Sequence, residues 1–285
     1  MSLDSTFIAV DWGSTNCRAY LIEGGGVTAS VEGLNGVLRT PDFPAAIASI
    51  RERLGQAPML LAGMVGSNRG WVEVPYVPSP AGLHELARAV HRVAPDIGIV
   101  PGVRTDRDIM RGEEVQAIGA AAAGRVTADA RICHPGTHAK WIEMTSGRIV
   151  DFRTAMTGEL FALVKSHSIL APDLGGQIEV GSAFLAGVDV ALGGEPLLDA
   201  LFGVRSRLIL GHLDQGEAAS FTSGLVIGFD AVAHASPGGQ VELLGDVRLC
   251  TLYAAALQHV GCATGSTDGS KAFVAGMIAI REAQG

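Results

Sequence analysis

A short turn near the start of this 285-residue sequence carries residues that could bind phosphate. It reads Asp11-Trp12-Gly13-Ser14-Thr15-Asn16. Glycine and small hydroxyl residues in a tight turn expose successive backbone N–H groups, which together bind phosphate oxygens. Asp11 can hold Mg²⁺ directly or through water, and Arg18 could neutralise charge on a transferred phosphoryl group. The predicted phosphate donors are Gly13, Ser14, Thr15 and Asn16, although an ordinary polar hairpin fits this first turn (residues 11–16) equally well.

A second turn (residues 134–138) resembles the first. The sequence from residue 134 reads His134-Pro135-Gly136-Thr137-His138-Ala139-Lys140. In both places an apolar strand pattern leads into a glycine turn, which is followed by a basic residue and another strand pattern. This echo indicates an internal repeat in which Gly136, Thr137 and His138 hold phosphate. A capped polar loop is the equal alternative, whereas a zinc site is disfavoured because no second Cys/His pair has suitable spacing.

Two adjacent glutamates, Glu113 and Glu114, follow Gly112 at the start of an alanine-rich helix pattern. Transfer of a phosphoryl group to a hydroxyl needs a carboxylate that orients the hydroxyl and accepts its proton. Either glutamate could do this, and Asp108 is a third candidate. Acidic residues in the first turn of a helix also occur simply because they interact well with the helix dipole, and spacing alone favours that alternative.

A long loop after a buried strand pattern, residues 63–71, carries polar and cationic side chains. Long ordered loops are often functional, and a guanidinium can bind a carboxylate through two hydrogen bonds. Ser67, Asn68 and Arg69 suit a carboxylate or polyol, and Trp71 could stack on a sugar face. Lys140, after the second turn, could supply a further donor. A surface loop anchored by Trp71 is the alternative. Gly245, between a strand and a helix pattern, could lie against an adenine ring.

The elements that must position these residues follow an α/β order. Residues 7–10, 18–22 and 27–31 predict an opening β-meander, and residues 43–54 predict an amphipathic helix. Strands are expected at 58–63, 97–100, 130–133, 140–144, 148–153 and 241–244. Helices are expected at 82–93, 113–124, 157–168, 178–192, 196–201, 216–234, 247–259 and 270–283. The length predicts two domains or one large one.

Composition narrows the class of protein. The net charge of −8 argues against a sequence-independent nucleic-acid binder, and 48% apolar residues suffice for a buried core. Thirty-eight glycines predict many turns and close backbone approaches. Four scattered cysteines fit a reducing compartment, no apolar run reaches the length of a membrane span, and residues 1–10 lack signal-peptide features. A cytoplasmic protein without membrane partners is expected.

Together, the turns, the Gly-Glu segment and Gly245 resemble the sugar kinase/heat-shock protein 70/actin superfamily. Six segments more closely resemble the 2-dehydro-3-deoxygalactonokinase family. They are VDWGSTNCRAYLI (10–22), GMVGSNRGWVEVPY (63–76), IMRGEEVQAIGA (109–120), CHPGTHAKW (133–141), FRTAMTGELF (152–161) and FTSGLVIGF (221–229). The sequence departs from the family pattern at Asn68, where a longer polar side chain is expected, and at Glu113, where related sugar kinases carry Asp.

The resemblance implies a two-domain actin-like ATPase fold of the ribonuclease H-like type, with an interdomain cleft. Residues 1–117 would hold the first turn and the sugar, residues 118–270 would bind the nucleotide, and a helix at 271–285 would pack back on the first domain. The implied activity is Mg²⁺- and ATP-dependent phosphorylation of 2-dehydro-3-deoxy-galactonate at its 6-hydroxyl, a step of galactonate breakdown. A phosphohydrolase of the same superfamily and a nucleotide-gated binding module are the alternatives. A homodimer is one assembly that the sequence leaves open.

Overall fold

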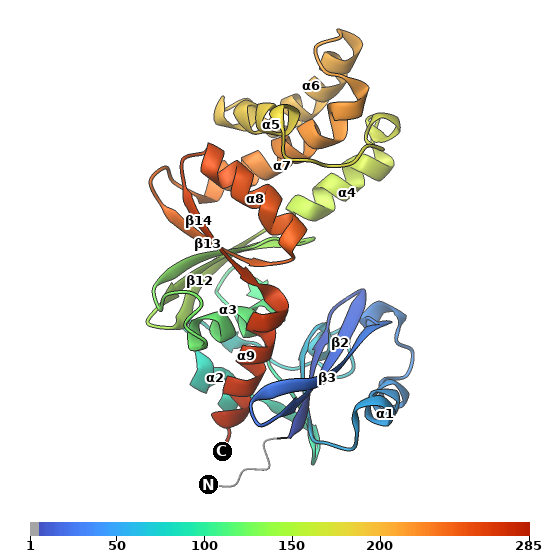
Figure 1. Ribbon diagram of the computed structural model, residues 1–285, viewed down its shortest axis with the longest axis vertical. Coiled ribbons are helices and arrows are strands. Elements are labelled where there is room, and N and C mark those ends of the chain that lie inside the picture. Colours follow the sequence, from blue (N-terminus) through green and yellow to red (C-terminus); the bar gives the residue numbers. More distant parts are fainter. Residues whose placement is uncertain (1–5) are drawn as a thin grey trace. The chain divides into compact units, whose positions relative to one another are not determined.

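The computed structural model describes residues 6–285, which form two compact units (Figure 1). Unit 1 contains the described residues up to Asp129, together with Glu143–Phe152 and Gly269–Gly285, and unit 2 contains Ala130–Ile142 and Arg153–Asp268. No helix among these 280 described positions is long and apolar enough to cross a lipid bilayer. The prediction for the N-terminus lies partly outside the described residues, since it includes residues 1–5.

Unit 1 is built on a six-stranded mixed sheet with the order β3-β2-β1-β4-β7-β6. Strands β1, β2 and β3 form the expected antiparallel meander, while β1, β4 and β7 run parallel. The carboxyl ends of β1 and β4 therefore lie at the same edge, with Trp12 paired with Gly63. The bounds are β1 Phe7–Trp12, β2 Asn16–Glu23, β3 Gly26–Asn35, β4 Met59–Gly63, β6 His91–Ala94 and β7 Ile97–Ile99.

Helix α1, Phe43–Leu54, packs against this sheet as its apolar spacing predicts. The Asp42 side chain caps the helix by accepting a hydrogen bond from the Ala45 N–H at 3.0 Å, and Gly55 follows its last residue. Ile47, Ile50 and Leu54 face the core of unit 1, where they join the fully buried strand β4. This packing places α1 in the same buried core as β1 and β4.

The rest of unit 1 includes helices α3, Glu113–Ala122, and α9, Gly269–Glu282, which lie side by side (Figure 1). They can approach closely because Gly119 and Gly276 have no Cβ. A Cβ on either glycine would come within 2.1 Å of a carbonyl oxygen of the other helix. The smaller elements are α2 Leu83–Arg88 and a three-stranded sheet of β5 Val77–Pro78, β8 Val103–Arg104 and β9 Ile109–Met110.

A five-stranded sheet with the order β12-β11-β10-β13-β14 belongs mainly to unit 2, although the parts of β11 and β12 within Glu143–Phe152 are assigned to unit 1. Its pattern repeats that of the first sheet, because three consecutive strands are followed by strands that run parallel to the first of the three. This repetition confirms the echo seen in the sequence. The bounds are β10 Ala130–His134, β11 Ala139–Thr145, β12 Arg148–Ala155, β13 Gln240–Gly245 and β14 Ala263–Asp268.

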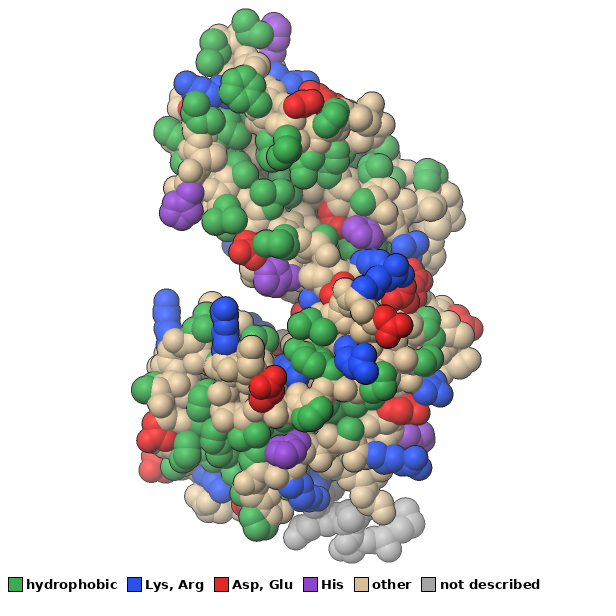
Figure 2. Space-filling view, turned by 180° about the vertical axis from the view of Figure 1, so that it is seen from behind, with side chains coloured by type: hydrophobic (Ala, Val, Ile, Leu, Met, Phe, Trp, Pro, Cys, Tyr) green, Lys and Arg blue, Asp and Glu red, His purple; other side chains and the backbone are tan. Residues whose placement is uncertain are grey.

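Five helices complete unit 2: α4 Thr157–His167, α5 Ser182–Leu192, α6 Leu197–Ile209, α7 Ala218–His234 and α8 Val247–His259. Glycines again allow close packing, since a Cβ on Gly187 or Gly224 would lie within 2.1 Å of a carbonyl oxygen on the facing helix, α7 or α5. Helix α6 leaves Leu198, Phe202 and Ile209 exposed. Hydrophobic side chains are accordingly visible on the surface of this helical part (upper part of Figure 2).

Several elements differ from the sequence predictions, which did not include the two-residue strands β5, β8 and β9. The helix expected over 82–93 ends at Arg88, and the chain then forms β6, which pairs antiparallel with β7. Helix α6 continues past the expected end at 201, because Gly203 is accommodated inside it. Strand β14 was not predicted because its residues, ATGSTD, have low strand propensity. Its parallel pairing with β13 stabilises the strand conformation in place of local propensity.

Candidate phosphate-binding and catalytic sites

The first turn is held by its carbonyl oxygens. Those of Gly13, Ser14 and Thr15 accept hydrogen bonds from the N–H groups of Val37, Leu38 and Gly36, at 3.0, 3.1 and 3.2 Å. The N–H of Gly13 closes the turn onto the Asn16 carbonyl at 2.9 Å. Among residues 6–285 the structure records no acceptor for the N–H groups of Ser14 and Thr15. The turn therefore retains free donors of the kind that bind phosphate oxygens.

Gly36 is the residue behind this arrangement, and the sequence analysis missed it. A Cβ at Gly36 would lie 2.4 Å from the Thr15 carbonyl carbon and 2.5 Å from the Asn16 nitrogen. Only glycine at position 36 lets residues 36–38, at the start of the short 3-10 helix Val37–Arg39, approach the turn this closely. The long separation in sequence, 20 residues or more, gives no local pattern that would reveal the contact.

The second turn is held in the same manner by the start of α4. The Glu159 N–H donates to the Thr137 carbonyl at 2.9 Å, and a Cβ on Gly158 would lie 2.4 Å from the Gly136 carbonyl oxygen. The Glu159 carboxylate also contacts the His138 ring, at 2.5 Å from Nε2. For the backbone N–H groups of residues 136–138, the described part of the chain contains no recorded acceptor.

Gly245 lies beside the second turn. It ends β13 with a φ of 149°, and its missing Cβ would be 3.6 Å from the Pro135 carbonyl oxygen and 3.8 Å from the His134 ring. The next residue, Asp246, caps α8 through hydrogen bonds from the Arg248 and Leu249 N–H groups. The structure thus brings together the predicted cofactor residues of unit 2.

Acidic and basic side chains gather at the end of β1. Asp11 pairs with Arg18 in the β1–β2 register, so both side chains lie on the same face of the sheet. Burial raises the pKa of Asp11 to about 6; the positive charge of Arg18 opposes this rise, and the negative charge of Glu113 adds to it. The predicted catalytic residues Arg18 and Glu113 therefore both lie close enough to Asp11 to influence its charge within unit 1.

The two glutamates of α3 have different environments. Glu114 is fully buried, and its Oε2 accepts a hydrogen bond from the Gly112 N–H at 2.6 Å. Glu113 is only half-buried, and its Oε2 accepts from the Arg111 N–H at 3.1 Å. Gly112, with a φ of 113°, brings this helix start against the end of β4, where its missing Cβ would be 3.4 Å from the Gly63 Cα. Glu113 is thus the more accessible of the two carboxylates.

Glu114 should make stability depend on pH. Burial raises its pKa from 4.5 to about 8; Glu113 adds to the rise, whereas the Gly112 N–H and Arg111 oppose it. Because the folded state binds the proton more tightly than the unfolded chain, this residue's contribution to stability should fall as pH rises from about 4.5 to about 8. Glu114→Gln should therefore gain stability relative to the wild type between pH 5 and pH 8, as measured by urea unfolding.

The control for this prediction is Glu52→Gln, which removes an exposed carboxylate from α1. Its unfolding free energy should follow that of the wild type across the same pH range. If the wild type and Glu114→Gln instead showed parallel pH dependence, the buried carboxyl group would titrate normally and the account of its environment would be wrong.

The predicted sugar-binding loop follows β4 and begins with the 3-10 helix Met64–Gly66. Ser67 is buried and stabilises the loop, since its hydroxyl donates to the Met64 carbonyl at 2.7 Å. Asn68 and Arg69 are exposed, and within the described chain neither side chain has a recorded hydrogen bond or ion pair. Trp71 stacks on Phe43 at 6.3 Å between ring centroids, so one indole face serves packing.

Arg111, which the sequence analysis quoted without a role, ties this region to α3. Its Nη2 donates to the Val74 carbonyl at 2.7 Å, and its guanidinium lies 4.2 Å above the Tyr76 ring. The side chain is almost fully buried, and its Nη1 approaches Gly66 so closely that a Cβ there would be 2.9 Å away. Arg111 therefore positions the loop and the glutamates relative to each other.

Two further candidates take part in local hydrogen bonds. Lys140 is buried in unit 2, where its Nζ donates to Thr154 Oγ1 at 2.9 Å, so it does not share a unit with the loop at residues 67–71. Asp108 lies between β8 and β9, and its Oδ1 accepts from the Ile109 N–H at 2.7 Å. Asp108 is therefore engaged in the local structure of the small sheet.

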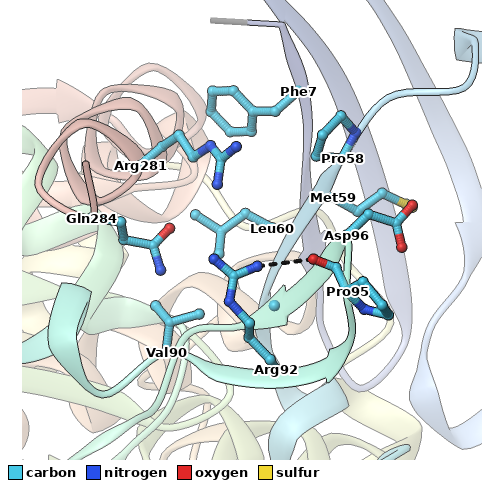
Figure 3. Close-up of a pocket in the computed structure, with 11 residues that line it drawn as sticks. Phe7, Pro58, Met59, Leu60, Val90, Arg92, Pro95, Asp96, Arg281 and Gln284 are labelled. Atoms are coloured by element: carbon cyan, nitrogen blue, oxygen red, sulfur yellow. Dashed lines mark hydrogen bonds between the residues drawn. The ribbon is translucent and has the colours of Figure 1, made fainter. Parts of the chain in front are cut away.

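A cavity of about 140 Å³ opens at the opposite edge of the first sheet (Figure 3). Phe7 and Met59, the first residues of the parallel strands β1 and β4, line it together with Arg92 and Arg281. Asp11 and Gly63 lie at the other ends of these strands. This cavity is therefore separate from the catalytic candidates.

The repeated sheet pattern and the two glycine turns define the fold class, a two-domain actin-like ATPase fold. Solved structures agree. The activator of the 2-hydroxyisocaproyl-CoA dehydratase from Clostridium difficile, solved with bound ADPNP, superposes with a TM-score of 0.52 at 13% identity, covering 98% of this chain and 96% of that one. A likeness at this level of identity supports the predicted fold and nothing finer.

The family follows from closer matches. The family model for 2-keto-3-deoxy-galactonokinase matches residues 11–280. The 2-dehydro-3-deoxygalactonokinase of Escherichia coli (strain K12) is 37% identical over 295 residues, and a probable 2-dehydro-3-deoxygalactonokinase of Rhizobium meliloti (strain 1021) is 34% identical over 309, each match covering 99% of both chains. A crystal structure from Sinorhizobium meliloti, assigned to the same activity, superposes with a TM-score of 0.91 at 31% identity, covering 97% of this chain and 98% of that one. This chain belongs to the 2-keto-3-deoxy-galactonokinase family.

Proposed function

We propose that this protein transfers the γ-phosphoryl group of ATP to the 6-hydroxyl of 2-dehydro-3-deoxy-galactonate. The observation that carries the proposal is the full-length relationship to 2-dehydro-3-deoxygalactonokinases, combined with two glycine turns that have free N–H donors. The product would be 2-dehydro-3-deoxy-6-phosphogalactonate, which belongs to galactonate breakdown. A cytoplasmic location and a homodimer are compatible with this proposal.

The two turns would hold the β- and γ-phosphates of ATP. Each offers backbone N–H groups whose positions are fixed in advance, because a neighbouring segment binds the carbonyl oxygens of the turn. Gly245, beside the second turn, would leave room for the adenine ring against the backbone. We assign the first turn to a domain of residues 1–117 and the nucleotide to a domain of residues 118–270, with the C-terminal helix, 271–285, completing the first.

Asp11 would hold Mg²⁺, which would neutralise negative charge on the ATP phosphates during transfer. The residues fit this ion, since burial and the negative charge of Glu113 disfavour the ionised Asp11 carboxylate, and a bound cation would stabilise it. Mg²⁺ needs only one or two protein carboxylates when phosphates and water supply its other ligands. Arg18 would then neutralise charge that builds up on the transferred phosphoryl group.

Glu113 would act as the general base that takes the proton from the attacking hydroxyl. A base must contact its substrate, and Glu113 is partly exposed whereas Glu114 has no exposed surface. It lies in the first turn of α3, directly after the Gly112 turn that packs against the end of β4. Glu114 would instead accept the hydrogen bond from the Gly112 N–H and so hold the turn that positions Glu113.

The sugar acid would bind at the loop after β4. Asn68 and Arg69 offer exposed polar groups, and the Arg69 guanidinium could bind the carboxylate through two hydrogen bonds. We also assign Ser67 and Trp71 to this site: Ser67 would shape the loop, and the partly exposed Trp71 would contact the sugar.

The proposal is tested by measuring ADP release with a panel of 2-keto-3-deoxy sugar acids and without any acceptor. We expect rapid release with the galactonate derivative and release close to background without it. Equal rates with and without a sugar acid would indicate a phosphohydrolase and contradict the proposal. A stable protein partner combined with no turnover on any sugar would favour a nucleotide-gated binding module.

A further inference from the structure

A buried carboxylate, Asp230 in α7, joins four elements of unit 2. Its Oδ1 accepts a hydrogen bond from Trp141 Nε1 of β11 at 2.8 Å. Its Oδ2 accepts from Tyr253 Oη of α8 at 2.6 Å and from Thr157 Oγ1, at the start of α4, at 2.7 Å. His234, one helical turn further along α7, places its Nδ1 3.1 Å from Oδ1. The proposed reaction does not use this group.

The charge of Asp230 is well compensated. Burial would raise its pKa, but the hydrogen bonds from His234, Tyr253, Thr157 and Trp141 outweigh burial and lower it. The same contact with Asp230 raises the pKa of His234. A buried carboxylate is costly unless its oxygens are satisfied, so an ionised group with several donors constrains the elements that supply them.

One of these donors, Thr157, is adjacent in sequence to the residues that contact the second turn. Thr157 is the first residue of α4, and the next two residues of the helix contact the turn. Gly158 packs on Gly136 so closely that a Cβ would lie 2.4 Å from its carbonyl oxygen. Glu159 donates its N–H to the Thr137 carbonyl at 2.9 Å. Asp230 therefore anchors the helix turn that holds the phosphate-binding backbone.

We infer that Asp230 is a positioning residue for the nucleotide, because it fixes the second turn through Thr157. This inference rests on the proposed function, since it presumes that the turn binds the phosphates of ATP. Loss of the Asp230–Thr157 hydrogen bond should weaken ATP binding and leave the affinity for the sugar acid unchanged. A role limited to core stability would lower the melting temperature without this selectivity.

The chain offers a matched set of variants at threonine. Thr157→Val removes the hydroxyl with little change of shape, whereas Thr157→Ser keeps it. Thr222→Val is the control, since Thr222 is fully buried in α7 and its hydroxyl donates to the Ala218 carbonyl of the same helix at 2.7 Å. These substitutions avoid Asp230→Asn, which would place an amide N–H₂ among donors in a buried site and could prevent folding.

The experiment measures binding of a non-hydrolysable ATP analogue with Mg²⁺ by calorimetry, together with the KM values for ATP and the sugar acid. We expect Thr157→Val to weaken analogue binding about tenfold, the effect of losing one charge-assisted hydrogen bond, and to raise the KM for ATP alone. Thr157→Ser and Thr222→Val should bind the analogue as the wild type does, even where the melting temperature falls.

Two results would overturn the inference in distinguishable ways. If Thr157→Val bound the analogue as tightly as the wild type, or no more weakly than Thr222→Val, Asp230 would serve core stability alone. If the wild-type protein itself did not bind the analogue, the proposed function would fail and the inference would fail with it.

Discussion

Glu113→Gln should lower kcat by about 10²- to 10⁴-fold, the usual contribution of a general base, and change the KM for ATP and for the sugar acid little. Glutamine has nearly the same shape and can still accept the Arg111 N–H, which Glu113 Oε2 accepts at 3.1 Å. Only the ability to take the proton from the hydroxyl is lost. Steady-state kinetics with each substrate varied in turn, repeated across pH, measures the effect.

Glu114→Gln is the paired control, since Glu114 is the adjacent glutamate but is fully buried. We expect it to keep most of its kcat, because the glutamine oxygen can still accept the Gly112 N–H. If both variants turned over at a near-normal rate, neither glutamate would be the base. A larger loss in Glu114→Gln than in Glu113→Gln would reverse the assignment.

Gly36→Ala should reduce kcat/KM for ATP by about 100-fold, a loss comparable to that caused by displacing a catalytic group by 1 Å. Its Cβ would lie 2.4 Å from the Thr15 carbonyl carbon, and the obstacle is backbone rather than a flexible side chain. The first turn must therefore move or residues 36–38 must detach from it. Either change disturbs the N–H groups of Ser14 and Thr15, which we propose to contact phosphate.

A control for this variant is Gly26→Ala, in the same unit. Gly26 has no positive φ, and a Cβ there would meet only the Glu23 carbonyl oxygen, at 3.9 Å. Its kcat/KM for ATP should match that of the wild type, as measured by coupled ADP release. Wild-type kinetics in Gly36→Ala would show that the geometry of the first turn is unimportant for nucleotide use.

Local patterns were sufficient to predict most elements of the fold. Helix α1 has apolar residues at helical spacing and a capping aspartate, while β4 is a short continuous apolar run, so each is specified by its own residues. Strand β6 was wrongly predicted as helix, because the pairing with β7 decides its structure and leaves no local signal. Strand β14 was missed for the same reason.

The candidate site was predicted only in part. The two turns and Glu113 have recognisable residue types, which the structure places at strand and helix ends. Gly36, Glu159 and Asp230 act on the turns from elsewhere in the sequence, through close backbone contact or buried hydrogen bonds. Such contacts depend on tertiary packing, and a glycine or aspartate in isolation does not reveal them. The choice between Glu113 and Glu114 likewise required their burial.

The central claim is most directly tested by ³¹P NMR of a reaction containing the protein, ATP, Mg²⁺ and 2-dehydro-3-deoxy-galactonate. We predict that each ADP formed is matched by one new phosphate monoester, coupled to the protons at carbon 6 of the sugar acid. Formation of ADP with inorganic phosphate and no monoester would contradict the account.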